Sequence, residues 1–260
     1  MTPQITSQHN RRLREIRKLR QRRRWRERSG RFVAEGEDLL HAADAAGWTP
    51  VERYSAAGSG LGGTEVDPAL LASASGLGSG TRTLAVYEER WAKSLAGPLC
   101  VYLHGVHDPG NVGAVLRSAQ AFGASSVALG PGTADPFSPK AVRASMGAIF
   151  AVPVAREGDL GALPGAKIAL VAGAGRPLCE LSHFAQEGSE QDAKVRPQVT
   201  LLVGAEREGL PSEVIDRADH TAHIPIKSNS LNAAMAATIA LYELTRALPA
   251  NERATRMARQ

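Results

Sequence analysis

The chain has 260 residues, of which 43% are hydrophobic and 22% charged, and this ordinary globular composition excludes wholesale disorder. Two cysteines, Cys100 and Cys179, exclude a disulfide scaffold and a cysteine-rich zinc module, and no apolar run approaches the roughly 18 residues of a membrane span. The length allows one large domain or two modest ones. We expect neither a signal peptide nor a membrane segment, and therefore a cytoplasmic location.

The net charge of +5 is unevenly distributed along the chain. Residues 11–28 carry 11 Lys and Arg against two acids, a net of +9, whereas the rest of the chain has a net charge of −4. The apolar residues of this block recur at helical spacing, which predicts one helix over 8–28 with Leu13, Ile16 and Leu19 as its apolar stripe. A block of this charge typically neutralises phosphates, and the alternative is a helix face that is merely solvated.

Short elements are predicted after the basic helix. Residues 31–34 and 83–87 have the composition of strands, and residues 36–46 have that of a helix. Glycine- and serine-rich stretches at 55–63 and 73–80 are predicted to be loops. The second stretch contains GLGSG, but no apolar strand precedes it and no helical pattern follows it, so it is not predicted to bind a nucleotide.

From residue 99 onward, apolar runs of about five residues alternate with helical patterns. Such alternation is typical of an α/β fold with a parallel sheet. Strands are predicted at 99–103, 125–130, 150–154, 167–172, 199–203 and 222–226, and helices at 112–122, 138–148, 211–217 and 230–247.

Two polar segments follow predicted strands, which is where parallel α/β enzymes place their sites. In HGVHDPGNVGAVLR (104–117), Asn111 is expected to cap the next helix and Arg117 to lie on its second turn. In GAEREGL (204–210), the glycines allow the backbone to approach a ligand closely, and Glu206 lies between them.

A third segment, IPIKSNSLN (224–232), follows the last predicted strand and opens the last predicted helix. Ser228, Asn229 or Ser230 is expected to cap that helix, whose free N–H groups can hold a carboxylate or carbonyl of a ligand. No dinucleotide GxGxxG, P-loop or GxSxG elbow follows a strand, and two close pairs of histidines have no accompanying ligand set. The three segments together therefore predict one pocket without a metal.

These segments resemble the three motifs of the SpoU/TrmH class of SPOUT RNA methyltransferases. DPFSPKAVRASMGAIFAVPV (135–154) resembles the same family between its first two motifs, and residues 5–45 resemble its N-terminal RNA-binding domain, a ribosomal-protein-like α/β sandwich. The resemblance implies two domains, 1–94 for binding RNA and 95–260 for methyl transfer. The matching motifs are DPGNVGAVLRSAQAFGA (108–124), LLVGAEREGL (201–210) and IPIKSNSLNAAMAATIALYE (224–243).

The resemblance also implies a deep trefoil knot in the C-terminal domain, a homodimer, and S-adenosylmethionine as the cofactor. Knots are rare, and periodicity alone does not indicate this one. The cofactor contacts it implies are Gly204, Ile224 and Leu231. The catalytic residues it implies are Asn111, Arg117, Glu206, Ser230 and Asn232, and the expected RNA-binding residues are Arg22, Arg23, Arg24, Arg26 and Arg143.

The implied activity is methylation of a ribose 2′-hydroxyl, in ribosomal RNA rather than transfer RNA. Because a normal arginine stays protonated, Arg117 is expected to organise phosphate and the developing alkoxide instead of accepting the proton. The alternatives are a transfer RNA 2′-O-methyltransferase, a base-methylating relative, and a noncatalytic RNA-binding or ribosome-assembly factor. Only KSN (227–229) separates IPI from SLN, where relatives have a longer loop with a glycine, so a tighter cofactor loop is expected.

Overall fold

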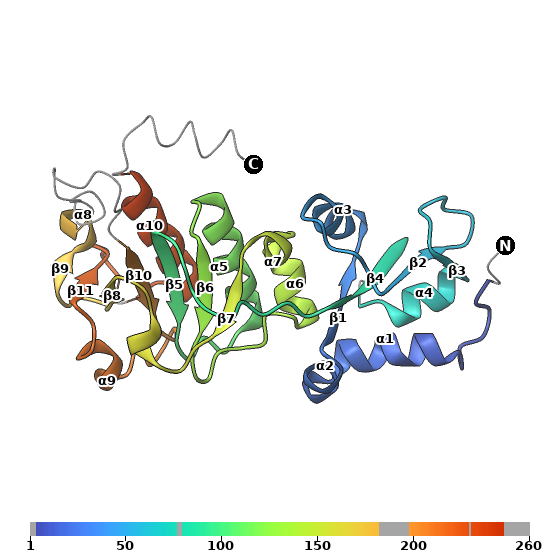
Figure 1. Ribbon diagram of the computed structural model, residues 1–260, viewed down its shortest axis with the longest axis horizontal. Coiled ribbons are helices and arrows are strands. Elements are labelled where there is room, and N and C mark those ends of the chain that lie inside the picture. Colours follow the sequence, from blue (N-terminus) through green and yellow to red (C-terminus); the bar gives the residue numbers. More distant parts are fainter. Residues whose placement is uncertain (1–3, 77–79, 182–197, 229, 247–260) are drawn as a thin grey trace. The chain divides into compact units, whose positions relative to one another are not determined.

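The chain forms two compact units in the computed structural model (Figure 1). The first unit comprises Met1–Arg90 together with Asp135–Ala151, and the second comprises Trp91–Ala134 and Val152–Gln260. A segment from the middle of the sequence therefore belongs to the N-terminal unit. The structure describes residues 4–76, 80–181, 198–228 and 230–246.

The first unit is built on a four-stranded sheet in the order β1-β4-β2-β3. Strand β4 runs antiparallel to both β1 and β2, and β3 runs parallel to β2. The strands are β1 (Arg31–Glu35), β2 (Glu52–Ala56), β3 (Thr64–Val66) and β4 (Thr83–Glu88). The helices of this unit are α1 (Arg11–Gln21), α2 (Arg23–Ser29), α3 (Glu37–Ala45), α4 (Pro68–Ala74), α6 (Pro139–Ser145) and α7 (Ala148–Ala151).

Two groups of buried side chains form the core of the first unit. The predicted stripe of α1, Leu13, Ile16 and Leu19, is buried and belongs to a cluster with residues of β2, β4 and α4, which confirms that part of the prediction. The second group is aromatic and joins β1, β4 and the loop after α3 to the segment from mid-sequence. Its members are Phe32, Trp48, Tyr87, Phe137 and Phe150, with ring centroids 4.8 Å apart for Phe32 and Phe137 and 5.2 Å for Trp48 and Phe150.

The basic segment forms two helices, so the prediction of one helix over 8–28 is wrong. The chain turns at Arg22, whose φ of −124° and ψ of 108° are extended. Arg26 explains why the break is stable, because its Nη1 donates to the carbonyl of Leu19 at 2.7 Å near the end of α1. The Arg26 side chain thereby donates to the carbonyl of Leu19, which would accept from a backbone N–H if α1 continued as a helix.

Three elements of the first unit were not predicted. Residues 55 and 56, at the start of the predicted loop 55–63, complete β2, and β3 follows that loop. Helix α4 begins at Pro68 and reaches into the predicted loop 73–80. Its start carries a recognisable signal, because Asp67 accepts from the backbone N–H groups of Ala69 and Leu70 and proline occupies the first helical position.

The second unit is a seven-stranded sheet in the order β7-β6-β5-β10-β8-β11-β9, and all its pairings are parallel. The α/β fold with a parallel sheet is therefore confirmed. The strands are β5 (Leu99–Leu103), β6 (Ser126–Leu129), β7 (Val154–Arg156), β8 (Ala166–Leu170), β9 (Arg176–Pro177), β10 (Val199–Val203) and β11 (His220–His223). The helices are α5 (Pro109–Ala121), η1 (Leu160–Ala162), α8 (Leu178–Leu181), α9 (Ser212–Ile215) and α10 (Ala233–Arg246).

Helices cover the buried strands of this sheet. Helices α5 and α10 pack on each other, and the hydroxyls of Ser118 and Thr238 lie 2.6 Å apart between them. Tyr102 and Leu202 form a cluster with side chains of η1 and α9. No helix among the described residues is long and apolar enough to cross a membrane.

Several predicted elements of the second half have different limits in the structure. The helix expected over 138–148 is α6 and ends at Ser145, and the strand expected at 222–226 is β11 and ends at His223. The strand expected at 150–154 is β7 and begins at Val154, because residues 148–151 form α7 with Phe150 buried. The helix expected over 230–247 is α10, which begins at Ala233, and residue 247 lies outside the described residues.

Candidate functional site

The three predicted loops leave the same edge of the parallel sheet. Strands β5 and β10 are neighbours, with Leu103 paired to Val203 at their carboxyl ends. Strand β8 lies between β10 and β11, so the third loop starts two strands further along. Because all these strands are parallel, the loops that follow them lie at the edge where such folds bind ligands.

Asn111 joins the three loops through its side-chain amide. Its Nδ2 donates to Oε1 of Glu206, from the second loop. Its Oδ1 accepts from Nδ2 of Asn232, from the third loop, at 3.1 Å. The structure thus brings together three of the five predicted catalytic residues, one from each motif.

The helix caps around this hub differ from the prediction. Asp108, not Asn111, caps α5 by accepting from the backbone N–H of Gly110 at 2.7 Å, which leaves the amide of Asn111 free to reach the other loops. Asn232 caps α10 by accepting from the N–H groups of Ala234 and Met235, at 3.0 and 3.3 Å. The serines expected to cap α10 do not do so, and Asn229 lies outside the described residues.

The other two predicted catalytic residues lie outside the hydrogen-bonded cluster. Arg117 is exposed on α5, and within the described part of the chain its guanidinium has no hydrogen-bond or ion-pair partner. Ser230 is exposed, and its carbonyl accepts from the hydroxyl of Ser228 at 3.3 Å. Both residues are therefore available to a ligand without breaking a contact of their side chains.

A cavity of about 700 Å³ opens beside Glu206 at this edge. The three predicted cofactor residues, Gly204, Ile224 and Leu231, all line it, and so do Glu206 and Ser230. Its volume is within the range of small-molecule sites, and its walls combine backbone with apolar side chains. Further lining residues that the sequence did not indicate include Leu170, Val171 and Ala172 at the end of β8 and Ile215 of α9.

Gly204 shapes the second loop from within. A Cβ at this position would lie 2.2 Å from the carbonyl carbon of Gly209, so no other residue fits without moving the backbone. Ala205 and Gly209 exchange two backbone hydrogen bonds, at 3.1 and 3.0 Å, which closes the loop into a tight turn. The cavity wall is therefore rigid where the loop leaves β10.

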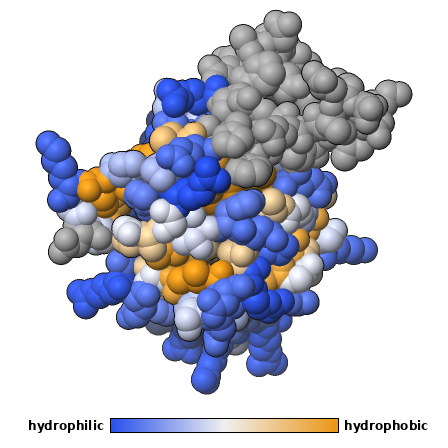
Figure 2. Space-filling view, turned by 90° about the vertical axis from the view of Figure 1, so that its left-hand side faces the viewer, coloured by the Kyte–Doolittle hydropathy of each residue, from blue (hydrophilic) through white to orange (hydrophobic). Residues whose placement is uncertain are grey.

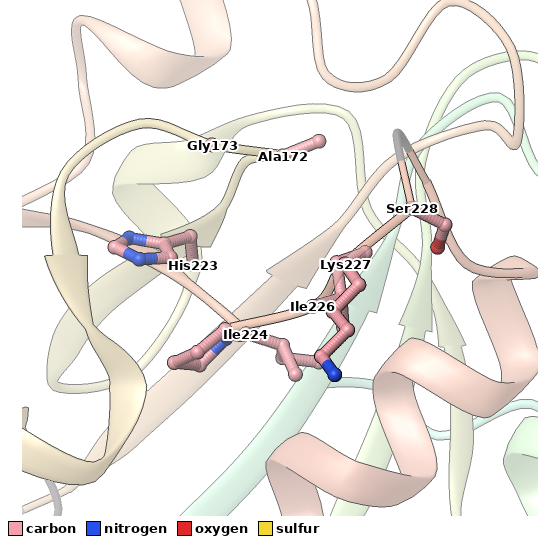
Figure 3. A pocket seen from close by; sticks show the side chains of 8 residues that line it. Ala172, Gly173, His223, Ile224, Ile226, Lys227 and Ser228 are labelled. Atoms are coloured by element: carbon pink, nitrogen blue, oxygen red, sulfur yellow. The ribbon is translucent and has the colours of Figure 1, made fainter.

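A second hollow of about 660 Å³ lies on the same loops, and Figure 3 shows His223 and Lys227 on its walls together with Ala172 and Gly173 from the loop after β8. It shares Ala172, Ile224 and Ile226 with the first cavity. In the space-filling view of the end that carries β9, hydrophobic residues are visible among hydrophilic ones (Figure 2).

His104 lies at the end of β5, two residues after Tyr102. The hydroxyl of Tyr102 and Nδ1 of His104 are 3.2 Å apart. Burial lowers the pKa of His104 and raises that of Tyr102, so both groups are held in their neutral forms near pH 7. No group of three or more potential metal ligands occurs within the described ranges.

The predicted RNA-binding arginines differ in their exposure. Arg22, Arg23 and Arg24 are exposed at the start of α2. Arg26 is only 4% exposed and is ion-paired to Asp135, so it does not belong to the predicted RNA surface. Arg143 is partly exposed, and its Nη1 lies 3.8 Å from the buried carboxylate of Glu35.

The sequence matches profiles of known protein families. The sequence profile of the SpoU rRNA methylase family matches residues 98–242, which is more than half of the chain. The chain belongs to the SpoU rRNA methylase family. A second profile, that of the MRM3-like substrate-binding domain, matches residues 10–89 of this SpoU family member.

Solved structures resemble nearly the whole SpoU chain. An AdoMet-bound rRNA methyltransferase from Sinorhizobium meliloti is 30% identical with a TM-score of 0.80, covering 96% of this chain and 99% of that one. The SpoU methyltransferase AviRb from Streptomyces viridochromogenes, in complex with AdoMet, is 26% identical with a TM-score of 0.77, covering 92% and 98%. The two-unit architecture is thus shared with enzymes of this family.

A curated relative supports the same assignment over the methylase region. The 23S rRNA (guanosine(2553)-2'-O)-methyltransferase RlmP of Bacillus subtilis is 33% identical over 145 residues, which is 55% of this chain and 56% of the relative. The chain thus spans about half the length of this curated relative.

Proposed function

We propose that this protein transfers a methyl group from S-adenosylmethionine to a ribose 2′-hydroxyl of ribosomal RNA. The observation that carries the proposal is the hydrogen-bonded cluster of Asn111, Glu206 and Asn232 beside the cavity lined by Gly204 and Leu231. Relatives named as 23S rRNA 2′-O-methyltransferases support ribose as the acceptor and ribosomal RNA as the substrate.

The cavity fits the proposed cofactor in size and chemistry. Gly204, Ile224 and Leu231 of the second and third loops line it, and apolar residues such as Leu210 and Ile226 provide a wall for an adenosyl group. When bound, S-adenosylmethionine supplies a methyl group that its sulfonium centre has already activated. The task left to the protein is therefore to align the ribose hydroxyl and to exclude water.

The remaining residues act on the acceptor side of the reaction. Asn111 holds Glu206 and Asn232 in fixed positions, so the loops that form the cavity keep one geometry. Arg117 stays protonated and is not a base, so its role is to hold phosphate and favour the developing alkoxide, with the proton passing to water. Ser230, at the cavity wall, shapes the space where cofactor and ribose meet.

RNA binding is assigned to residues 1–94 and methyl transfer to residues 95–260, and the profile matches at 10–89 and 98–242 support this division. Exposed Arg22, Arg23 and Arg24 carry the charge that attracts the phosphate backbone. A trefoil knot in the second unit and a location in the cytoplasm belong to the same proposal.

A homodimer is also part of the proposal. Helix α10 has apolar side chains exposed at helical spacing, Met235 at 62%, Ile239 at 37% and Tyr242 at 50%. The ring of Tyr242 contacts that of Phe122, which follows α5 directly, with centroids 6.0 Å apart, and this extends the apolar surface beyond α10. An exposed stripe of this kind supports an interface between two copies of the chain.

Methylation of transcripts tests the proposal directly. Purified protein is incubated with S-adenosylmethionine labelled at the methyl group and with 23S rRNA, 16S rRNA or bulk transfer RNA, and the RNA is then digested to nucleosides. A labelled 2′-O-methylnucleoside from ribosomal RNA is the expected product. A methylated base would overturn ribose as the acceptor, label only in transfer RNA would overturn the substrate, and cofactor binding without any transfer would indicate a noncatalytic RNA-binding factor.

A further inference from the structure

A buried ion pair joins α2 to the segment from mid-sequence. Nε and Nη2 of Arg26 lie 2.8 and 2.7 Å from the same carboxylate oxygen of Asp135, and the two side chains are 5% and 10% exposed. Both residues belong to the first unit, although 109 positions separate them in the sequence. Because both charges are largely withdrawn from water, each depends on the other for its stabilisation.

Arg26 also contacts the end of the preceding helix. Its Nη1 donates to the carbonyls of Leu19 and Arg20, at 2.7 and 3.4 Å, where α1 approaches its last turn. One guanidinium thus links α1, α2 and Asp135. The angle between α1 and α2 at the break is fixed by this side chain, since Arg22 at the junction has no side-chain cap.

Asp135 is itself held rigidly. Its second carboxylate oxygen accepts from the backbone N–H of Phe137 at 2.8 Å, and its carbonyl accepts from the N–H of Ser138 at 3.2 Å. The ring of Phe137 is buried against Phe32 of β1. Asp135 therefore offers Arg26 a fixed anchor that is connected to the sheet of the first unit.

Helix α2 carries exposed cations but little apolar surface of its own. Arg22, Arg23, Arg24 and Arg28 are exposed at or on this seven-residue helix, which is too short to be stable without tertiary contacts. Trp25 attaches it to α1 through Glu15 and Lys18. The adjacent Arg26 provides the second attachment, so Arg26 and Trp25 together determine which way the exposed arginines point.

We infer that Asp135 is a positioning residue for RNA recognition: through Arg26 it orients the arginines of α2 toward the phosphate backbone. The inference rests on the proposed binding of RNA by the first unit. The inference also assigns a part in RNA binding to a residue outside the substrate-binding profile. That profile ends at residue 89, and Asp135 lies within the stretch matched by the methylase profile.

The test measures RNA binding by the full chain carrying Asp135→Ala, Asp135→Asn or Asp135→Glu. Binding of a labelled RNA hairpin is followed across a salt series, because each phosphate neutralised contributes roughly 0.7–0.9 to the log–log slope. Glu27→Gln is the matched control, since it breaks the exposed pair of Arg23 and Glu27 on the same helix, 2.8 Å long, without touching Arg26.

We expect Asp135→Ala and Asp135→Asn to flatten the salt slope by about one to two, with a corresponding loss of affinity, because α2 no longer presents its arginines together. Asp135→Glu keeps the carboxylate and should retain a slope close to that of the wild type, and Glu27→Gln should not flatten it. A role in stability alone would lower the fraction of competent protein and leave the slope unchanged.

Several outcomes overturn the inference. The first is an unchanged salt slope in both Asp135→Ala and Asp135→Asn. The second is an equal flattening of the slope in Glu27→Gln. The third is amide exchange in α2 of Asp135→Ala and Asp135→Asn that is as slow as in the wild type. If Asp135→Ala does not fold, amide exchange in Asp135→Asn decides, because a positioning role predicts faster exchange confined to α2. Failure of the wild type to bind RNA would instead remove the proposed function on which the inference rests.

Discussion

Replacement of Arg117 by Ala should abolish most methyl transfer while leaving the fold and the cofactor site intact. The side chain is exposed on α5 and has no partner among the described residues, so its loss changes the free energy of unfolding by no more than about 0.5 kcal/mol. Arg117 does not line the cavity, and the affinity for S-adenosylmethionine should stay within about twofold of the wild type, a difference of about 0.4 kcal/mol.

The loss in rate follows from the role assigned to the guanidinium. Removing one donor that stabilises developing negative charge costs about 2.7–4 kcal/mol, which corresponds to a decrease of about 10²–10³ in the rate of the chemical step. Arg117→Lys keeps the charge but not the planar fork, so it should recover only part of this loss.

Single-turnover methylation, with enzyme in excess over ribosomal RNA, isolates the chemical step, and calorimetry measures cofactor binding on the same samples. Arg217→Ala is the matched control, because it removes another exposed arginine of the second unit, one that is ion-paired with exposed Asp159. A rate for Arg117→Ala above about one tenth of the wild type, a change below about 1.4 kcal/mol, would remove Arg117 from the mechanism. So would an equal loss in the control.

Other measurements address RNA binding, assembly and the domain division. Replacing Arg22, Arg23 and Arg24 with Gln should flatten the log–log salt dependence of RNA binding by about two to three, and an unchanged slope in filter binding would mean that these side chains are merely solvated. Tyr242→Glu should convert a dimer to a monomer in sedimentation at micromolar concentration, and a wild type that is already monomeric would contradict the interface. A fragment starting at residue 95 should bind S-adenosylmethionine in calorimetry because the cavity lies wholly within it, and binding by the full chain alone would refute this.

The strands of the second unit follow closely from the sequence. LCVYL and VTLLV were predicted as strands at 99–103 and 199–203, and β5 and β10 have those limits. Both strands are buried throughout, so their sequences are continuous apolar runs, and such runs are a strong signal in a parallel sheet. The sequence also placed each polar loop after its strand, and parallel pairing then brings the loops to one edge.

The predictions of secondary structure are wrong where contacts with distant parts of the chain determine the local structure. The break at Arg22 depends on Arg26, whose charge is balanced by Asp135, and no periodicity within 8–28 encodes that contact. The sequence predicts residues 150 and 151 as part of a strand, but they belong to α7, where Phe150 is buried against Trp48 and its carbonyl accepts from the indole N–H at 2.9 Å. In both cases a tertiary contact overrides local preference.

The sequence identifies the individual residues of the candidate site but not the hydrogen bonds between them. Asn111, Glu206 and Asn232 were each identified, yet the hydrogen bonds among them require three loops that meet only in the folded sheet. Ala172 and its neighbours at the end of β8 carry no chemical signal, so their place in the cavity wall depends on strand order. Arg26 is a residue that the sequence misassigns to the RNA surface, because nothing within the basic block indicates that this arginine is buried.

The mid-sequence origin of α6 and α7 has a consequence for synthesis on the ribosome. Arg90 ends the first stretch of the N-terminal unit, and about 60 further residues must be added before Ala151 completes it. At roughly 5–20 residues per second this takes about 3–12 seconds. During that interval Phe32 lacks the ring of Phe137, Trp48 lacks that of Phe150, and Arg26 lacks its counterion Asp135. The first part of the chain to emerge therefore cannot finish folding until about a third of the methylase sequence has been made, and its incomplete apolar core stays exposed for that time.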